Sequence, residues 1–324
     1  MGNVRFVTNT TVVQVMGPEA SQQDVYNQAV RPIVEDVLLG YNGTVIAYGQ
    51  TGAGKTYTLA NLDPAQVGMM PRAMADIFNH ASADALNIYK VYVSYVQIYM
   101  EVIKDLLMPS AEKLDVREDT NGVFLSNVHE EEVHNTQDCL KLLQRGDSNR
   151  VFAATEMNIH SSRSHAIVIV TVYKQRRRPQ ARRNENGDEV VGRQTTMGRM
   201  FLVDLAGSER LKKSKSVGVR ATEAKHINQS LTTLGMCVNA RADPNSTHVP
   251  FRDSKLTRLL QESLGGNAKT AMIIAVSDVM EHADETVQSL VFGSRAILVK
   301  TTARVNQYID LTLINEQIAA QLQV

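Results

Sequence analysis

The sequence has few cysteines, no long apolar run and no excess of charge of either sign. Its 324 residues include two cysteines, too few for a disulfide framework or a metal site, so a reducing interior such as the cytoplasm is expected. No stretch approaches the ~18 consecutive apolar residues of a membrane span, and the first residues lack the pattern of a secretory signal. The formal net charge is zero, so global charge predicts no nucleic-acid partner, and electrostatic docking must come from local clusters.

Apolar residues, at 43% of the chain, support a sizeable core for one large α/β domain or two small ones. Strand patterns alternate with helix patterns, with no internal repeat and no obvious linker. One α/β domain with a mixed central β-sheet is therefore predicted.

The local patterns predict individual elements. Strands are expected at 4–15 (one or two), 44–48, 91–98, 114–116, 123–128, 165–173, 199–204 and 271–276. Helices are expected at 21–39 (capped by Ser21, and kinked or split by Pro32), 71–81, 100–107, 136–145 (capped by Thr136), 223–239, 254–263 and 285–298. Residues 149–157 fit a short helix or an ordered loop, 174–194 a flexible hairpin loop, and 301–310 an extended segment. The apolar spacing in 311–324 fits the start of a coiled coil or a packed or frayed terminal helix.

A glycine-rich stretch follows the strand predicted at 44–48. It reads GQTGAGKT and fits the phosphate-loop pattern G-x-x-x-x-G-K-[ST] in full. Its glycines let backbone N–H groups point at a phosphate chain, Lys55 supplies positive charge, and the Thr56 hydroxyl can ligate Mg²⁺. A glycine-rich turn without a ligand is the weaker alternative, since a chance match arises roughly 1% of the time. The residues predicted to hold the phosphates are Gly49, Gln50, Thr51, Gly52, Ala53, Gly54, Lys55, Thr56 and Tyr57.

Two further segments carry phosphate-site chemistry, NIHSSRSH at 158–165 and DLAGSE at 204–209. Asp204 ends a predicted strand, where a carboxylate can hold a water on Mg²⁺, and the Gly207 N–H can reach a γ-phosphate. Arg163 and Glu209 have opposite charges and could pair across the nucleotide. Each segment alone is a weak signal, because serine-rich turns and Asp-x-x-Gly at strand ends are common. His160 and His165 are expected to be structural.

This ordered trio resembles the kinesin motor domain, in which AYGQTGAGKT, NIHSSRSH and LVDLAGSE stand nearly as they do here. Further similar stretches are 41–44, 68–72, 224–235, 248–260, 265–270 and 292–296, so the resemblance covers about 21–300. It implies a P-loop NTPase fold of the kinesin type, with a mixed central β-sheet flanked by helices on both faces. Residues 1–300 would form the motor domain, and 301–324 a neck linker and the start of a neck helix.

The resemblance also implies a function: ATP hydrolysis, with Mg²⁺, that is stimulated by microtubules and coupled to movement along them. The implied partner is the α/β-tubulin polymer, with a homodimer through segments after the neck and no membrane partner. The implied location is the microtubule cytoskeleton of the cytoplasm.

Each functional residue then has an implied role. Lys55 would bind the outer phosphates, Thr56 and Ser162 would ligate Mg²⁺, and Asp204 would hold a metal-bound water. Asn158, Ser161 and Gly207 would sense the γ-phosphate, and Arg163 and Glu209 would form a salt bridge that positions the attacking water. The helix from Glu223 would carry the change to the filament face.

Basic residues supply the implied tubulin contacts. Arg252, Lys255 and Arg258 lie at i, i+3 and i+6 and share roughly one face, although a solvated basic face is the ordinary interpretation. Lys212, Lys213 and Lys215 form a second cluster with the same two interpretations. For the basic run at 176–183, a solvated loop is favoured over filament contact.

The sequence departs from the family pattern in places. No Arg-x-Arg-Pro motif precedes Ser21, so the adenine platform is expected to be absent, and ATP binding to be weak and poorly base-selective. The strand at 271–276 is then expected to become an exposed sheet edge. Gln97 and Met100 stand where kinesins usually have Glu and Asn.

Two other functions are alternatives to a motor. One is a nonmotile, catalytically weak microtubule-binding module, which the departures favour and the intact 158–165 and 204–209 segments oppose. The other is a signalling GTPase, which would need an Asn-Lys-x-Asp motif that the sequence lacks. The segment 301–310 resembles a neck linker, since Val305-Asn306 occurs at a comparable place.

Overall fold

A large mixed β-sheet forms the centre of the computed structural model, which describes residues 3–9, 12–109, 114–119, 122–156, 161–177, 180–183, 189–209 and 219–310. Within these residues, an eleven-stranded sheet has the order β2-β1-β12-β3-β11-β9-β4-β5, with β10 and β13 paired to β11 and β8 paired to β4. Strands β6 and β7 form a separate hairpin. The strands are β1 (Asn3–Asn9), β2 (Val12–Met16), β3 (Gly43–Tyr48), β4 (Asn87–Tyr99), β5 (Val102–Asp105), β6 (Asp115–Asp119), β7 (Gly122–Ser126), β8 (Glu131–Val133), β9 (His165–Arg176), β10 (Gln180–Arg183), β11 (Glu189–Asp204), β12 (Lys269–Ser277) and β13 (Gln307–Asp310).

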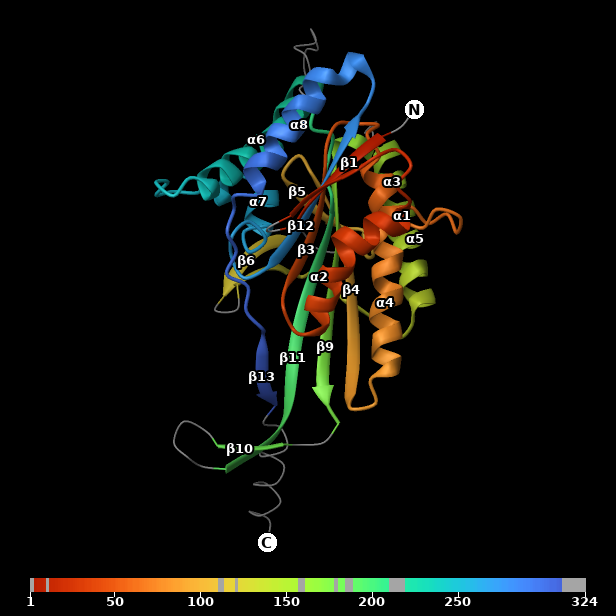
Figure 1. The fold of residues 1–324 in the computed structure, drawn as a ribbon, viewed down its shortest axis with the longest axis vertical. Coiled ribbons are helices and arrows are strands. Elements are labelled where there is room, and N and C mark those ends of the chain that lie inside the picture. The colour runs from red at the N-terminus through yellow and green to blue at the C-terminus, as the bar shows by residue number, and fades with distance from the viewer. Residues whose placement is uncertain are drawn as a thin grey trace.

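Helices cover both faces of this sheet (Figure 1). Their bounds are α1 (Gln22–Val25), the π-helical η1 (Tyr26–Val30), α2 (Arg31–Leu38), α3 (Lys55–Ala60), α4 (Met69–Ala83), α5 (Thr136–Glu156), η2 (Ser161–Arg163), α6 (Val219–Ala242), η3 (Phe251–Asp253), α7 (Lys255–Leu259), η4 (Met280–His282) and α8 (Ala283–Ala296). Helices α1 to α5 lie on one face and α6 to α8 on the other. None of the helices in the described ranges is long and apolar enough to cross a membrane.

The central strands explain why two separate cores form. In β3, Val45 and Ala47 pack in the cluster beneath α1 to α5, whereas Ile46 packs in the cluster beneath α6 to α8. Successive side chains of a strand point to opposite faces, so a fully apolar strand such as β3 needs helices on both sides. β3 runs parallel to both β11 and β12, whereas the other pairings are antiparallel, which confirms the predicted mixed sheet.

The first helix begins and bends as predicted. The Asp24 N–H donates to Ser21 Oγ at 3.1 Å and the Ser21 N–H donates to the Asp24 carboxylate at 2.9 Å, a reciprocal capping box. Proline cannot donate a helical hydrogen bond, and the turn before Pro32 is widened into the π-helix η1. The predicted disruption at Pro32 is therefore confirmed as a π-helical turn.

The helix predicted at 100–107 is wrong. Met100 and Glu101 have positive φ angles of 50° and 59° and form a two-residue turn that joins β4 to β5, with Tyr99 opposite Val102. Positive φ at both central positions is typical of a type I′ hairpin turn. The β-branched Val102 and Ile103 then continue as a strand rather than a helix.

The exposed edge predicted at 271–276 is also wrong. Strand β1 pairs antiparallel with β12 along its length, from Asn3 opposite Ser277 to Asn9 opposite Ala271, and β2 pairs on the outer side of β1. The alternating segment near the N-terminus therefore supplies two strands that satisfy the backbone groups of β12. An edge strand remains, but it is β2.

The segment 174–194 is a hairpin, as predicted, but much of it is strand rather than loop. β9 continues to Arg176, β11 begins at Glu189, and β10 pairs with β11. The extended segment after 301 adds β13, which pairs antiparallel with β11. The helical pattern predicted at 311–324 lies outside the described residues.

Other boundaries moved more modestly. The helix predicted to end near Arg145 is α5, which continues to Glu156, and its first turn is capped by Asn135, whose side chain accepts from the Asp138 N–H at 2.9 Å. Ser254 caps α7 as predicted, but α7 ends at Leu259 rather than near 263.

Candidate functional site

The phosphate loop lies between the end of β3 and the start of α3. Gly49, Gly52 and Gly54 have φ angles of 143°, 81° and 93°, a region that side chains rarely adopt. A Cβ on Gly49 would also collide with the Ala275 carbonyl oxygen of β12. The glycines in this loop are therefore required by its backbone path.

Lys55 is held inside this loop. Its side chain is 7% exposed, and its Nζ donates to the Gln50 carbonyl oxygen at 2.8 Å. Burial lowers the pKa of Lys55, and the nearby carboxylates of Asp204 and Glu209 oppose that shift. A buried ammonium this close to a cradle of backbone N–H groups is placed to bind an anion.

Thr56 and Asp204 meet although 148 positions separate them in the chain. β3 and β11 are parallel neighbours with Ala47 opposite Asp204, so the loop after β3 and the end of β11 share one edge of the sheet. The Thr56 hydroxyl donates to Asp204 Oδ2 at 2.7 Å, while Asp204 Oδ1 is buried with no hydrogen-bond partner among the described residues. Mg²⁺ prefers such oxygen donors and usually keeps several waters, so the orphaned oxygen fits a hydrated Mg²⁺.

Arg150 is a site residue that the sequence did not reveal. It lies in α5, with Nη1 at 3.2 Å from Asp204 Oδ2, and its Nη2 donates to the Ser164 carbonyl oxygen at 3.2 Å. The side chains of Arg150 and Asp204 are only 7% and 2% exposed. No local motif marks Arg150, and only the packing of α5 against α4, β4 and η2 brings it here.

The three predicted segments come together at this edge. The Gly207 N–H donates to the Ser162 carbonyl oxygen at 2.9 Å, and the Ser208 N–H donates to the Gly49 carbonyl oxygen at 3.0 Å. A Cβ on Gly207 would collide with the side chains of Thr51 and Glu209, so any other residue here would displace the contact between them. Asn158 lies outside the described residues, as does the side chain of Ser161.

Glu209 contacts the phosphate loop rather than Arg163. Its carboxylate accepts from the Thr51 N–H at 2.8 Å and from the Thr51 hydroxyl at 2.5 Å. The ion pair predicted between Arg163 and Glu209 is not among those found in the described part of the chain. It stays a prediction for the nucleotide-bound form.

Gln97, one of the departures from the family pattern, lies behind this site. Its Nε2 donates to the Ser164 hydroxyl at 2.7 Å, with both groups buried. At the end of the same hairpin, Glu101 accepts from the Ser254 hydroxyl at 2.9 Å and from the Lys255 N–H at 2.6 Å. The β4–β5 hairpin thus contacts both the 158–165 segment and the start of α7.

The basic residues of η3 and α7 are paired with acids on β6. Arg258 Nη2 lies 2.7 Å from the Glu118 carboxylate, and the exposed Arg252 lies 4.0 Å from the same group. Lys255 Nζ lies 3.3 Å from Asp115 Oδ1. The three cations do lie together, as predicted, but each has an intramolecular partner. Lys212, Lys213 and Lys215 lie outside the described residues.

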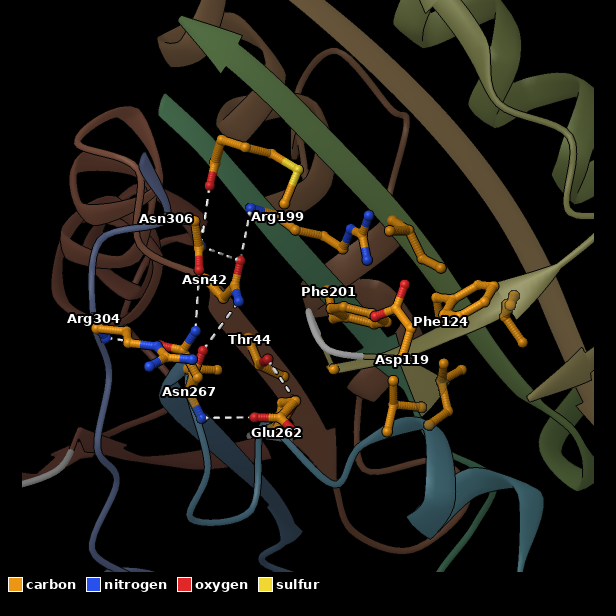
Figure 2. A pocket seen from close by; sticks show the side chains of 18 of the residues that line it. Asn42, Thr44, Asp119, Phe124, Arg199, Phe201, Glu262, Asn267, Arg304 and Asn306 are labelled. Carbon is orange, nitrogen blue, oxygen red and sulfur yellow. Dashed lines mark hydrogen bonds between the residues drawn. The ribbon is translucent and has the colours of Figure 1, made fainter. Parts of the chain in front are cut away.

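A pocket of about 890 Å³ lies away from the phosphate loop, between β11, the β6–β7 hairpin and the segment before β13 (Figure 2). On one side, Asn306 Nδ2 donates to the Asn42 side chain at 3.0 Å and to the Met197 carbonyl oxygen at 3.1 Å. Asn267 donates to Asn306 Oδ1 at 3.0 Å. These bonds fix the segment 301–306 along the sheet, next to the pocket.

Known proteins resemble this chain over most of its length. A family model for the kinesin motor domain matches residues 7–299. The kinesin heavy chain of Syncephalastrum racemosum is 45% identical over 306 residues, covering 93% of this chain and 31% of that protein. The kinesin heavy chain of Drosophila melanogaster is 45% identical over 298 residues, with coverage of 91% and 29%. The chain therefore spans about a third of the length of these curated relatives.

A solved structure is similar too. The structure described as "Structure of a fast kinesin: Implications for ATPase mechanism and interactions with microtubules" matches with a TM-score of 0.80 and 41% sequence identity. The match covers 95% of this chain and 87% of that one. The predicted resemblance and the predicted fold class are both confirmed.

Proposed function

Since the chain belongs to the kinesin motor domain family, we propose that it hydrolyses ATP and couples hydrolysis to movement along microtubules. The observation that carries the proposal is the convergence of Lys55, Thr56 and Asp204 at one sheet edge, with Asp204 Oδ1 buried and without a hydrogen-bond partner in the described part of the chain. A phosphate loop with a buried cation and a carboxylate at this place suits a nucleoside triphosphate with Mg²⁺.

Catalysis at this site is placement and electrostatics. Lys55 neutralises the outer phosphates, and the N–H groups of the 49–54 loop hold the phosphate chain. Thr56 and Ser162 would ligate Mg²⁺ and Asp204 would hold one of its waters, and the bound ion would neutralise charge that develops on the phosphate oxygens. Asn158, Ser161 and Gly207 read the γ-phosphate, and Arg163 with Glu209 orients the attacking water.

For Glu209 this role requires a change of partner. Its carboxylate is bonded to Thr51 in the structure, so it must leave Thr51 before it pairs with Arg163. The Gly207 N–H likewise must leave the Ser162 carbonyl oxygen to reach a phosphate. Such exchange suits segments that order around a γ-phosphate and are released when it departs.

The microtubule contact is assigned to the basic face. Arg252, Lys255 and Arg258 would meet the acidic tubulin surface, together with Lys212, Lys213 and Lys215. Residues 301–324 would form the neck linker and the start of a neck helix, and segments beyond them would form a homodimer. The location that follows is the microtubule cytoskeleton of the cytoplasm.

The decisive experiment measures ATP hydrolysis by the purified chain with and without polymerised tubulin. The expected result is a rate that rises with microtubule concentration and a microtubule affinity that differs between an ATP analogue and ADP. Glu209→Ala is the matched variant, expected to bind ATP and microtubules but not to turn over.

Two other results would contradict the proposal. Nucleotide-independent sedimentation with microtubules, without hydrolysis, would make the chain a nonmotile binding module. Neither hydrolysis nor sedimentation would remove the microtubule function altogether. Tight, adenine-selective ATP binding would separately contradict the weak base recognition predicted from the missing Arg-x-Arg-Pro motif.

A further inference from the structure

His165 is the first residue of β9 and follows the serine-rich turn directly. It is 3% exposed, and both ring nitrogens have partners. The Ala206 N–H donates to His165 Nδ1 at 3.1 Å, and His165 Nε2 lies 2.8 Å from the Ser230 hydroxyl of α6. Because Nδ1 accepts, the ring proton is on Nε2, which donates to Ser230 Oγ.

The imidazole of His165 does not gain or lose a proton near neutral pH. Burial, with the positive charges of Arg150 and Lys55 added, lowers the pKa of His165 to about 3. The ring is therefore neutral at physiological pH and keeps the same tautomer, with one acceptor and one donor. His165 therefore joins the Ala206 N–H to the Ser230 hydroxyl through its two ring nitrogens, and these two hydrogen bonds are called the His165 link.

The two partners of His165 lie in different segments, Ala206 after β11 and Ser230 in α6. Ala206 lies between Asp204 and Gly207. Asp204 accepts from the Thr56 hydroxyl, and the Gly207 N–H donates to the Ser162 carbonyl oxygen. Ser230 is 3% exposed and sits within α6, the long helix that packs against α7 and α8. A neighbouring contact, between Ser208 Oγ and Ser289 Oγ of α8, is 3.5 Å and thus at the limit of a hydrogen bond.

We propose that His165 is a positioning residue that couples the 204–209 segment to α6, through the Ala206–His165–Ser230 hydrogen bonds. When the γ-phosphate draws Gly207 away from Ser162, Ala206 moves with it, and the imidazole carries that displacement to Ser230. The inference rests on the proposed function and adds to it the side chain through which α6 responds to nucleotide.

Two substitutions separate the ends of the link. His165→Asn puts an amide oxygen near the position of Nδ1, which keeps the Ala206 bond and loses the Ser230 bond. His165→Gln reaches the position of Nε2 and can keep the Ser230 bond while losing the Ala206 bond. Ser230→Ala removes the hydroxyl that His165 Nε2 contacts and leaves the Ala206 bond in place. Ser94→Ala is the matched control, because Ser94 is 2% exposed and its hydroxyl donates to the His129 carbonyl oxygen at 2.8 Å, outside the link.

The first readout is the ratio of microtubule affinities in an ATP analogue and in ADP. His165→Asn, His165→Gln and Ser230→Ala are each expected to shrink this ratio by about 3- to 10-fold, the size of one hydrogen bond. Ser94→Ala leaves it unchanged. The double variant H165N/S230A behaves like either single variant, because both remove the same bond. Equal effects of S230A and S94A, or additive effects of H165N and S230A, would overturn the coupling role.

The second readout does not need microtubules. Hydrogen exchange of α6 is expected to change when an ATP analogue replaces ADP in the wild-type chain, and this change is lost in H165N. Exchange in the 204–209 segment still responds in H165N. If α6 responds to nucleotide in H165N as it does in wild type, the inference is wrong. If the wild-type chain shows no microtubule-stimulated ATPase, the proposed function fails instead, and hydrogen exchange still decides the link.

Discussion

Two of the regions in which positive charge gathers, the phosphate site and the basic face of η3 and α7, differ in burial. At the phosphate site, the side chains of Arg150 and Asp204 are 7% and 2% exposed, and Lys55 is buried beside them. On the basic face, the side chain of Arg252 is 80% exposed, and its partner Glu118 is 39% exposed. Buried charges are costly without partners, so the first region must be arranged in advance around an anion. Exposed charges are screened by water and can exchange one partner for another.

The comparison predicts the largest functional effect at the buried cation. Lys55→Met is expected to lower ATP turnover by at least about 100-fold, because the charge that neutralises the outer phosphates is lost. The folded state should be no less stable, since a buried ammonium is replaced by an apolar group of similar length. Steady-state ATPase and thermal unfolding measure the two effects. Turnover within about threefold of wild type would show that Lys55 does not face the nucleotide.

Helix α5 carries one buried and one exposed ion pair, so the contributions of the two pairs to unfolding free energy can be compared within one helix. Arg150→Met leaves Asp204 buried with a lost charge partner, and about 3–5 kcal/mol of unfolding free energy is expected to be lost. Arg145→Met removes the exposed partner of Glu131 and should cost about 0–1 kcal/mol. Urea denaturation of the two variants gives the difference directly. Equal losses of unfolding free energy in the two variants would mean that burial does not decide how much an ion pair contributes to stability.

The two regions also differ in how far the sequence predicted them. The phosphate loop is a contiguous motif whose glycines and Lys55 are set by local backbone geometry, so it could be recognised without a fold. Arg150 could not, because its contact with Asp204 spans 54 positions and depends on how α5 packs. The ion pairs of α7 were missed for the same reason. β6 contributes Asp115 and Glu118 only through tertiary packing.

The errors in the fold have similar causes. Met and Glu give no sign of positive φ in a sequence, so the turn at Met100 and Glu101 could not be told from the start of a helix. The missing Arg-x-Arg-Pro motif predicted an exposed edge at β12. β1 covers that edge without the motif, because backbone pairing needs no particular side chains. Long strands were under-predicted in the 174–194 hairpin because polar strands lack the apolar alternation that marks a half-buried strand.

The docked segment before β13 should show an intermediate effect. Asn306 Nδ2 faces the Gly40 and Met197 carbonyl oxygens, each at 3.1 Å, and the Asn42 side chain at 3.0 Å. Asn306→Ala is expected to weaken docking of 301–310 by about 1 kcal/mol, because partly buried acceptors lose their donor. Hydrogen exchange at β13 and at the paired part of β11 measures the loss. Val305→Ala, next to it in the chain, is the control and should leave exchange nearly unchanged.

The smallest expected effect lies on the basic face. Whether Glu118→Gln raises or lowers microtubule affinity tests directly whether this face differs from the phosphate site. Glu118 holds Arg258 at 2.7 Å and Arg252 at 4.0 Å, so it neutralises charge that an acidic partner would otherwise meet. The Arg258 side chain is 17% exposed and that of Arg252 is 80% exposed. If both pairs exchange, Glu118→Gln should raise microtubule affinity by about 2- to 5-fold at low salt, with the gain fading as ionic strength rises. Glu132→Gln, an equal change of charge on β8, is the control for net charge alone. Weaker binding by E118Q than by E132Q would mean that Glu118 orients the cations rather than masking them, so that this face, like the phosphate site, is arranged before its partner arrives.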